Sequence, residues 1–136
     1  MTNGDPLTTS PTSSSTPTLL DRLRSLFGGG PADGRLGSKV KVAQALELVR
    51  DGATLLDVRE NGEWKSGHAP GAIHVPLGDI DKAPRRLKQG RPVVVMCASG
   101  MRSRSAAKHL RSLGYDAASL SGGMAAWQHA GGAVRR

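Results

Sequence analysis

The sequence predicts an α/β domain with a parallel sheet covered by helices on both faces. From residue 39 to residue 136, short apolar segments alternate with segments of helical periodicity. The apolar segments are short, which is typical of strands buried between two layers of helices. The chain has 136 residues, enough for one domain with its own core.

Each element follows from its own pattern. Four segments are expected to be strands: residues 53–58, 71–77, 92–96 and 115–120. Helical spacing predicts helices at residues 42–52, 102–114 and 122–132, and a turn or short helix at 61–67. The segment 79–90 is expected to be helical at its end, because Pro84 interrupts its start.

The first 38 residues are expected to lie outside the domain. Residues 1–18 are mostly serine, threonine and proline and predict a disordered tail. Residues 19–38 predict a short amphipathic helix followed by a glycine-rich linker, and the domain itself is expected to span 39–136. The helix is expected either to pack on its own domain or to dock to a partner or membrane surface.

Composition restricts the setting and the partners. The chain has one cysteine, no apolar run of the ~18 residues that a membrane span needs, and no signal-peptide core, so a cytoplasmic location is expected. The net charge is +8, and the excess falls within residues 39–136. Nucleic acid is not an expected partner, because the basic residues are scattered and aromatic residues make up 3% of the chain. Such a charge also concentrates small anions near a site.

Cys97 is the main candidate for chemistry, because it directly follows the predicted strand 92–96. The segment 97–102, CASGMR, is predicted to be a loop that leads into a helix near Ser103. Gly100 lets the loop fold back, so that consecutive amides can point at the sulfur. These amides, the helix N-terminus and an inward-turned Arg102 would all favour a thiolate. The alternative is a cysteine that acts as a small buried apolar residue.

Several stretches, taken in order, resemble the rhodanese (sulfurtransferase) family: LLDVRENGEWKSGHAPGAIHVPL, the strand with CASGMRS, and LSGGMAAWQHAG. They cover about residues 55–131 and are specific in combination. The resemblance implies a five-stranded parallel sheet between helices. It also implies that Cys97 takes a sulfane sulfur from a donor, holds it as a persulfide and passes it to cyanide or a thiol. No cofactor and no metal are expected.

The resemblance implies roles for the residues around Cys97. Arg59 is expected to contact the anionic donor, or to pair with a carboxylate, or both. Arg102 and the amides of the loop are expected to bind substrate; the loop residues are Ala98, Ser99, Gly100 and Met101. Asp57 and Ser103 are expected to support the site, with Asp57 orienting Arg59 or the loops. His68 is expected to be structural.

Three questions of function stay open in the sequence. Ser99 stands where thiosulfate-specialised members often have a basic residue, so thiosulfate, polysulfide, a persulfidated protein and glutathione persulfide are all candidate donors. The domain could be a sulfur carrier or a partner-binding module, with a protein as its sulfur acceptor. A cysteine phosphatase or arsenate reductase is the third reading, but in those enzymes five residues separate cysteine from arginine. Here Arg102 follows after four.

Overall fold

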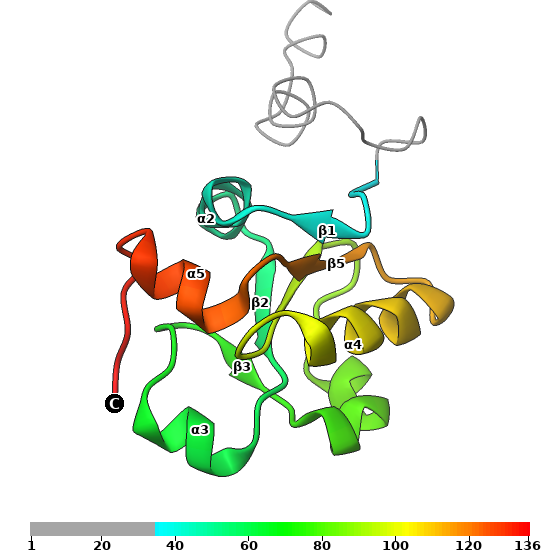
Figure 1. The fold of residues 1–136 in the computed structure, drawn as a ribbon. Helices are drawn as coiled ribbons and strands as arrows, with labels where there is room; N and C mark the ends of the chain where they lie inside the picture. The colour runs from blue at the N-terminus through cyan, green and yellow to red at the C-terminus, as the bar shows by residue number, and fades with distance from the viewer. Residues whose placement is uncertain (1–34) are drawn as a thin grey trace, which may run out of the picture.

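The computed structural model describes residues 35–136, and its centre is a five-stranded sheet (Figure 1). The strands are β1 (Lys39–Val40), β2 (Thr54–Asp57), β3 (Ile73–His74), β4 (Val93–Met96) and β5 (Ala117–Leu120). Their order in the sheet is β1-β5-β4-β2-β3, and every neighbouring pair is parallel. The predicted five-stranded parallel sheet is therefore confirmed.

Helices cover both faces of this sheet, as the alternating pattern predicts. They are α2 (Val42–Arg50), α3 (Asn61–Ser66), the 3-10 helix η2 (Leu77–Arg85), α4 (Met101–Ser112) and α5 (Gly123–His129). Residues of α2 and α5 share one apolar cluster with the sheet, and residues of α4 and η2 share the other. The domain therefore has three layers, with the sheet in the middle (Figure 1).

Strand β4 joins the two clusters. Val94 and Met96 point into the cluster formed with α2 and α5, whereas Val93 and Val95 point into the one formed with α4 and η2. All four side chains are fully buried, and each such burial stabilises the fold by about 1.5–3 kcal/mol. Since β4 is central in the sheet, its carboxyl end is fixed from both faces. Cys97 is the first residue beyond that end.

Two elements differ from the sequence-based expectation. The pattern did not indicate β1, which has two residues and forms only by pairing Lys39 and Val40 with β5, about 80 residues away along the chain. In segment 79–90 the helical part is the beginning, not the end, so that prediction was wrong. The amide of Asp79 donates to the carbonyl of Pro76 and starts a 3-10 helix. Pro84 lacks the N–H that an α-helix would need there, and the helix ends at Arg85.

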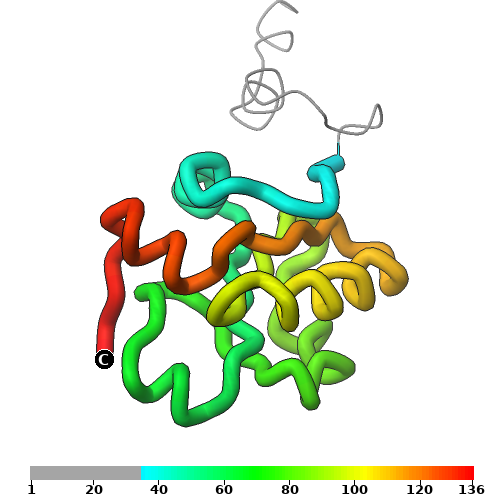
Figure 2. Tube along the Cα trace, in the orientation of Figure 1, coloured from blue at the N-terminus to red at the C-terminus, as the bar shows by residue number. Residues whose placement is uncertain are grey.

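The carboxyl ends of the strands bring the predicted site residues together. Asp57 of β2 pairs in register with Met96 of β4, so the segments that follow these strands leave the sheet side by side. At the same side of the domain, His68 and Arg135 form an antiparallel bridge. The C-terminal segment accordingly runs beside the segment that contains α3 (Figure 2).

The N-terminal predictions fall largely outside the described residues. The predicted tail 1–18 and the helix within 19–38 lie there, and the domain boundary at residue 39 stays a prediction. Leu36, from the predicted linker, is 4% exposed and packs against the cluster of α2 and α5. Between residues 35 and 136, no helix is long and apolar enough to cross a membrane.

Candidate active site

The sulfur of Cys97 lies inside a tight loop between β4 and α4. Cys97 is 1% exposed, and the amide of Gly100 donates a hydrogen bond to its Sγ over 3.0 Å. Gly100 is the N-cap of α4 and has a φ of 115°, which glycine adopts without strain. This conformation turns its N–H back toward the sulfur, and the positive end of the helix faces the same atom.

A pair of buried hydroxyls completes the surroundings of the sulfur. The Sγ of Cys97 lies 3.5 Å from the Oγ of Ser103, which in turn lies 2.7 Å from the Oγ of Ser119. In the thiol state, Cys97 donates to Ser103, and the Ser103 hydroxyl donates to the carbonyl of Gly100 over 3.1 Å. In the thiolate state, the Ser103 hydroxyl can turn to donate to the sulfur. Ser119 can donate to Ser103 in either state.

These contacts shift the pKa of Cys97 in favour of the ionised sulfur. Burial is the largest single influence and raises the pKa of Cys97. The Ser103 hydroxyl and the amides of Ser103, Gly100 and Ser99 act in the opposite direction. Together they outweigh burial and lower the pKa of Cys97 below its usual value. The site can therefore supply a nucleophilic thiolate without a histidine base.

Gly123 of α5 packs against the backbone on the other side of the loop. A Cβ on Gly123 would lie 2.7 Å from the carbonyl carbon and oxygen of Ala98, closer than real Cβ atoms come. The absence of that atom lets the amide of Met124 donate to the carbonyl of Cys97 over 2.7 Å. Two helix N-termini thus meet at Cys97, one at its side chain and one at its backbone.

Asp57 and Arg59 form a buried ion pair beside the loop. Asp57 is 0% exposed and Arg59 is 5% exposed. The carboxylate accepts hydrogen bonds from the backbone amide, Nε and Nη2 of Arg59 over 2.8–3.0 Å. Nη2 also donates to the carbonyl of Gly67 over 2.6 Å. Asp57 therefore fixes the orientation of the Arg59 side chain, and within residues 35–136 only Nη1 of this guanidinium has no hydrogen-bond partner.

Arg102 forms a second ion pair, with Glu63 of α3. Nη1 and Nη2 of Arg102 donate to the two carboxylate oxygens of Glu63 over 2.7 and 2.9 Å. Glu63 also accepts the amide of Glu60 in the capping box of α3. The Arg102 hydrogen bonds are the main cause that lowers the pKa of Glu63 to about 2. Arg102 thus joins the first turn of α4 to α3, and its charge also lies close enough to interact with that of Cys97.

Comparison with known proteins places this geometry in a family. The model of the rhodanese-like domain matches residues 41–130. The chain belongs to the rhodanese-like family. It is 39% identical over 74 residues to a Bacillus subtilis protein named "Putative sulfurtransferase YtwF", a match that covers 54% of this chain and 72% of the relative.

The match covers different shares of the other relatives. It is 38% identical over 61 residues to the B. subtilis protein named "Putative sulfur carrier protein YrkF", covering 45% of this chain but only 33% of the relative. The crystal structure of a rhodanese-related protein from Thermoplasma volcanium superposes with a TM-score of 0.67 at 28% identity, covering 73% of this chain and 98% of that one. The resemblance in the sequence is confirmed, and sulfur transfer is the general function that these relatives support.

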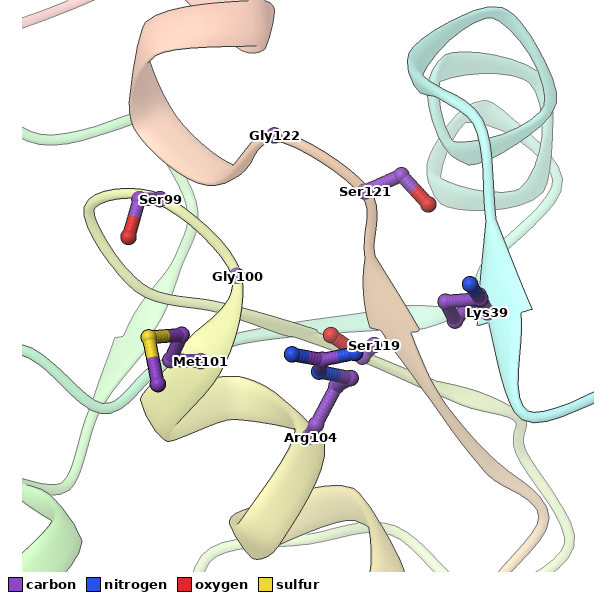
Figure 3. Close-up of a pocket in the computed structure, with 8 residues that line it drawn as sticks. All are labelled: Lys39, Ser99, Gly100, Met101, Arg104, Ser119, Ser121 and Gly122. Atoms are coloured by element: carbon purple, nitrogen blue, oxygen red, sulfur yellow. The ribbon is translucent and has the colours of Figure 1, made fainter.

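The rhodanese-like loop differs in detail from the prediction. The amides of residues 98–102 were expected around the sulfur, whereas the amides that lower the pKa of Cys97 are those of Ser99, Gly100 and Ser103. Ala98 is half-buried, and Met101 is 71% exposed at the lip of the loop (Figure 3). Substrate contacts by Ala98, Ser99, Gly100, Met101, Arg59 and Arg102 stay predictions.

Two residues of the site, Glu63 and Ser119, were not identified from the sequence. Glu63, the partner of Arg102, could have been suspected only as a capping-box acid of α3. Ser119, the partner of Ser103, lies within a strand and carries no local signal. Both contacts join segments 16 or more residues apart, which only the folded sheet brings together.

The histidines near the site have structural contacts. The ring of Trp64 stacks with those of His68 and His74, at centroid distances of 3.7 and 4.7 Å. Nδ1 of His68 lies 2.9 Å from the carbonyl of Trp64, and Nε2 of His74 lies 2.8 Å from that of Arg59. Among residues 35–136, no group of three histidine, cysteine or acidic side chains could hold a metal ion.

Replacing Ser103 with alanine is expected to raise the pKa of Cys97, because the thiolate loses its hydroxyl donor. A hydrogen bond to a charged group is worth about 1.5–3 kcal/mol, so nucleophilic reactions near neutral pH are expected to slow about tenfold or more. The ultraviolet absorbance of the thiolate, titrated against pH with a Cys97→Ser blank, measures the shift. Ser105→Ala is the control, because Ser105 lies exposed on the same helix. Equal titration curves for the two variants would contradict the assigned role.

The Glu63 and Arg102 pair is expected to make stability depend on acid pH. Folding lowers the pKa of Glu63 from 4.5 to about 2, so its contribution is complete above about pH 4.5 and is lost as pH falls toward 2. Urea unfolding of Glu63→Gln should therefore show a smaller loss of stability over this interval than the wild type. Glu47→Gln, which breaks the exposed pair with Arg50, is the control. An unchanged pH dependence in Glu63→Gln would reject the linkage.

Proposed function

We propose that the protein is a sulfurtransferase that moves a sulfane sulfur from an anionic donor to a thiophilic acceptor through a persulfide on Cys97. The observation that carries this proposal is the hydrogen bonding of the Cys97 sulfur by the Gly100 amide at the N-terminus of α4. This arrangement holds a negatively charged sulfur, and a persulfide is such a group. Sulfur transfer through this group needs no proton donor, because the leaving groups, sulfite and the Cys97 thiolate, are stable anions.

The two half-reactions balance without a cofactor. The Cys97 thiolate attacks the outer sulfur of thiosulfate, a new S–S bond forms, and the bond to the sulfonate sulfur breaks. Sulfite leaves with the electron pair. In the second step, cyanide or a thiolate attacks the outer sulfur of the persulfide, and the Cys97 thiolate leaves. Cys97 is the only cysteine of the chain, so an acceptor must come from outside it.

Arg59 and Arg102 are proposed to attract the anionic donor. Both arginines already pair with a carboxylate. Arg59 could therefore donate a hydrogen bond to the donor only through its free Nη1, whereas Arg102 would attract the donor through its charge. Arg59→Lys keeps a charge beside Asp57 but loses the planar fork. A higher KM for thiosulfate with little change in kcat would support this role, and an unchanged KM would reject it.

A sulfur carrier is the second candidate. The similarity to YrkF favours it, since that relative is named as a sulfur carrier. A carrier would form the same persulfide but pass its sulfur to a protein rather than turn over quickly with cyanide. The two candidates therefore share the first half-reaction and differ in the second.

Intact mass spectrometry after mixing with thiosulfate tests the shared step. We expect the wild type to gain one sulfur that cyanide removes as thiocyanate, and Cys97→Ser to gain none. Fast removal by cyanide over many cycles supports the sulfurtransferase, whereas slow removal together with fast transfer to a protein thiol supports the carrier. No added sulfur from thiosulfate, polysulfide or glutathione persulfide, combined with release of phosphate from p-nitrophenyl phosphate, would replace the proposal with a phosphatase.

A further inference from the structure

A basic groove runs from the lip of the Cys97 loop along α4. We define this groove by Lys39, Met101, Arg104, Lys108, Arg111 and Ser119. Two adjoining cavities of about 230 and 360 Å³ form it, and both are lined by Lys39 and Arg104. In Figure 3, Arg104 extends from α4 toward Ser119 of β5, and Lys39 lies on the neighbouring strand. The first cavity is also lined by Ser99 and Gly100, so the groove begins at the loop that holds the sulfur.

The charge of the groove is not balanced by the protein. None of the residues that line the two cavities is acidic. Within residues 35–136, Lys39, Arg104 and Lys108 have no ion pair, and Arg111 donates to the carbonyl of Ala117. Elsewhere several acidic side chains have cationic partners, as in the pairs of Glu47 with Arg50 and Glu63 with Arg102. The groove therefore keeps a positive field that a partner can neutralise.

The lip of the groove adds an apolar contact. Met101 is 71% exposed, the highest value among the large apolar side chains exposed within residues 35–136. Methionine and arginine are enriched in protein interfaces, and methionine adapts to different partner surfaces. No aromatic side chain lines the groove, so it offers no stacking platform for the bases of a nucleic acid.

We infer that the groove binds an acidic segment of the protein that exchanges sulfur with Cys97. This inference rests on the proposed function, for it names the class of its donor or acceptor as an acidic polypeptide. Arg104, Lys108 and Arg111 follow one another at spacings of four and three residues and so line one face of α4, about 10 Å from first to last. Acidic side chains at alternate positions of an extended segment lie about 7 Å apart, close to the ~6 Å rise between Arg104 and Lys108.

Fluorescence anisotropy with two labelled peptides of equal length tests the groove. One peptide carries aspartate at alternate positions, and the other carries asparagine there. Both are titrated with the full chain, with Arg104→Glu/Lys108→Glu, and with the control Arg85→Glu/Lys88→Glu. The control reverses the same two kinds of charge at exposed positions of η2 and the turn after it. Measurements at about 0.01 M salt, where the Debye length is ~30 Å, are repeated at about 0.15 M.

We expect the acidic peptide to bind the wild type and the control variant similarly, and the groove variant at least about tenfold more weakly at low salt. Equal weakening in both variants, or equal binding of the asparagine peptide to the wild type, would overturn the inference. A single-stranded RNA of the same charge that binds the wild type more tightly than the acidic peptide would also overturn it. Sulfur uptake by Cys97 is measured separately, so its absence would reject the proposed function while the anisotropy still decides on the groove.

Discussion

Replacing Cys97 with serine is expected to abolish sulfur transfer while leaving the fold intact. The serine hydroxyl is similar in size and can keep the contacts with the Gly100 amide and Ser103. It does not ionise near neutral pH, and it cannot form a persulfide. Turnover should therefore fall at least about a thousandfold, to the rate measured without protein.

Thiocyanate production from thiosulfate and cyanide measures this loss, and urea unfolding shows whether the fold is kept. Ser105→Ala is the matched control, because it removes an exposed hydroxyl from the helix after the loop without touching the sulfur. Its turnover should stay within about threefold of the wild type, since isolated surface substitutions have small effects. Equal turnover by Cys97→Ser and the wild type would remove the basis of the proposed mechanism.

Replacing Arg59 with alanine is expected to have the largest effect on stability. Asp57 would stay buried as a carboxylate with only the backbone amide of residue 59 as a partner. Removing one partner of a buried ion pair costs about 3–5 kcal/mol, a large share of the ~5–15 kcal/mol that stabilises a typical domain. Any loss of activity in this variant must therefore be separated from a loss of folded protein.

Urea unfolding compares Arg59→Ala with Arg50→Ala, which breaks an exposed pair with Glu47 and should cost at most about 1 kcal/mol. The double variant Asp57→Asn/Arg59→Ala should recover part of the loss, because no charge is then left buried. If Arg59→Ala proved as mild as Arg50→Ala, the pair with Asp57 would not hold the loops as the geometry indicates.

The features that were predictable from sequence are those with local causes. The strand 92–96 and the helix after it are visible because their apolar residues recur at short intervals. The loop at Cys97 is visible because Gly100 stands between them, and the structure gives that glycine a φ of 115°. The ion pair of Asp57 with Arg59 likewise joins residues two positions apart.

The features that could not be predicted depend on distant segments. Strand β1 exists because β5 lies beside it, and two residues are too few to show a period. An inward-turned Arg102 would have favoured the thiolate, but Glu63 holds both of its terminal nitrogens, and nothing near either residue in the sequence specifies that pairing. The same holds for Ser119, whose contact with Ser103 requires β5 and α4 to be packed together.

The burial of Cys97 affects which sulfur atom of a persulfide an incoming nucleophile can attack. Only 1% of Cys97 is exposed, so little of the protein's own sulfur faces solvent. A second sulfur bound to it would extend about 2 Å further along the S–S bond, and an incoming nucleophile would meet that atom first. Attack there regenerates the enclosed thiolate and carries the added atom away, whereas attack at the inner atom would leave a mixed disulfide. Enclosure of the anchoring sulfur thus selects which of the two sulfur atoms is attacked, although the same S–S bond breaks in both cases.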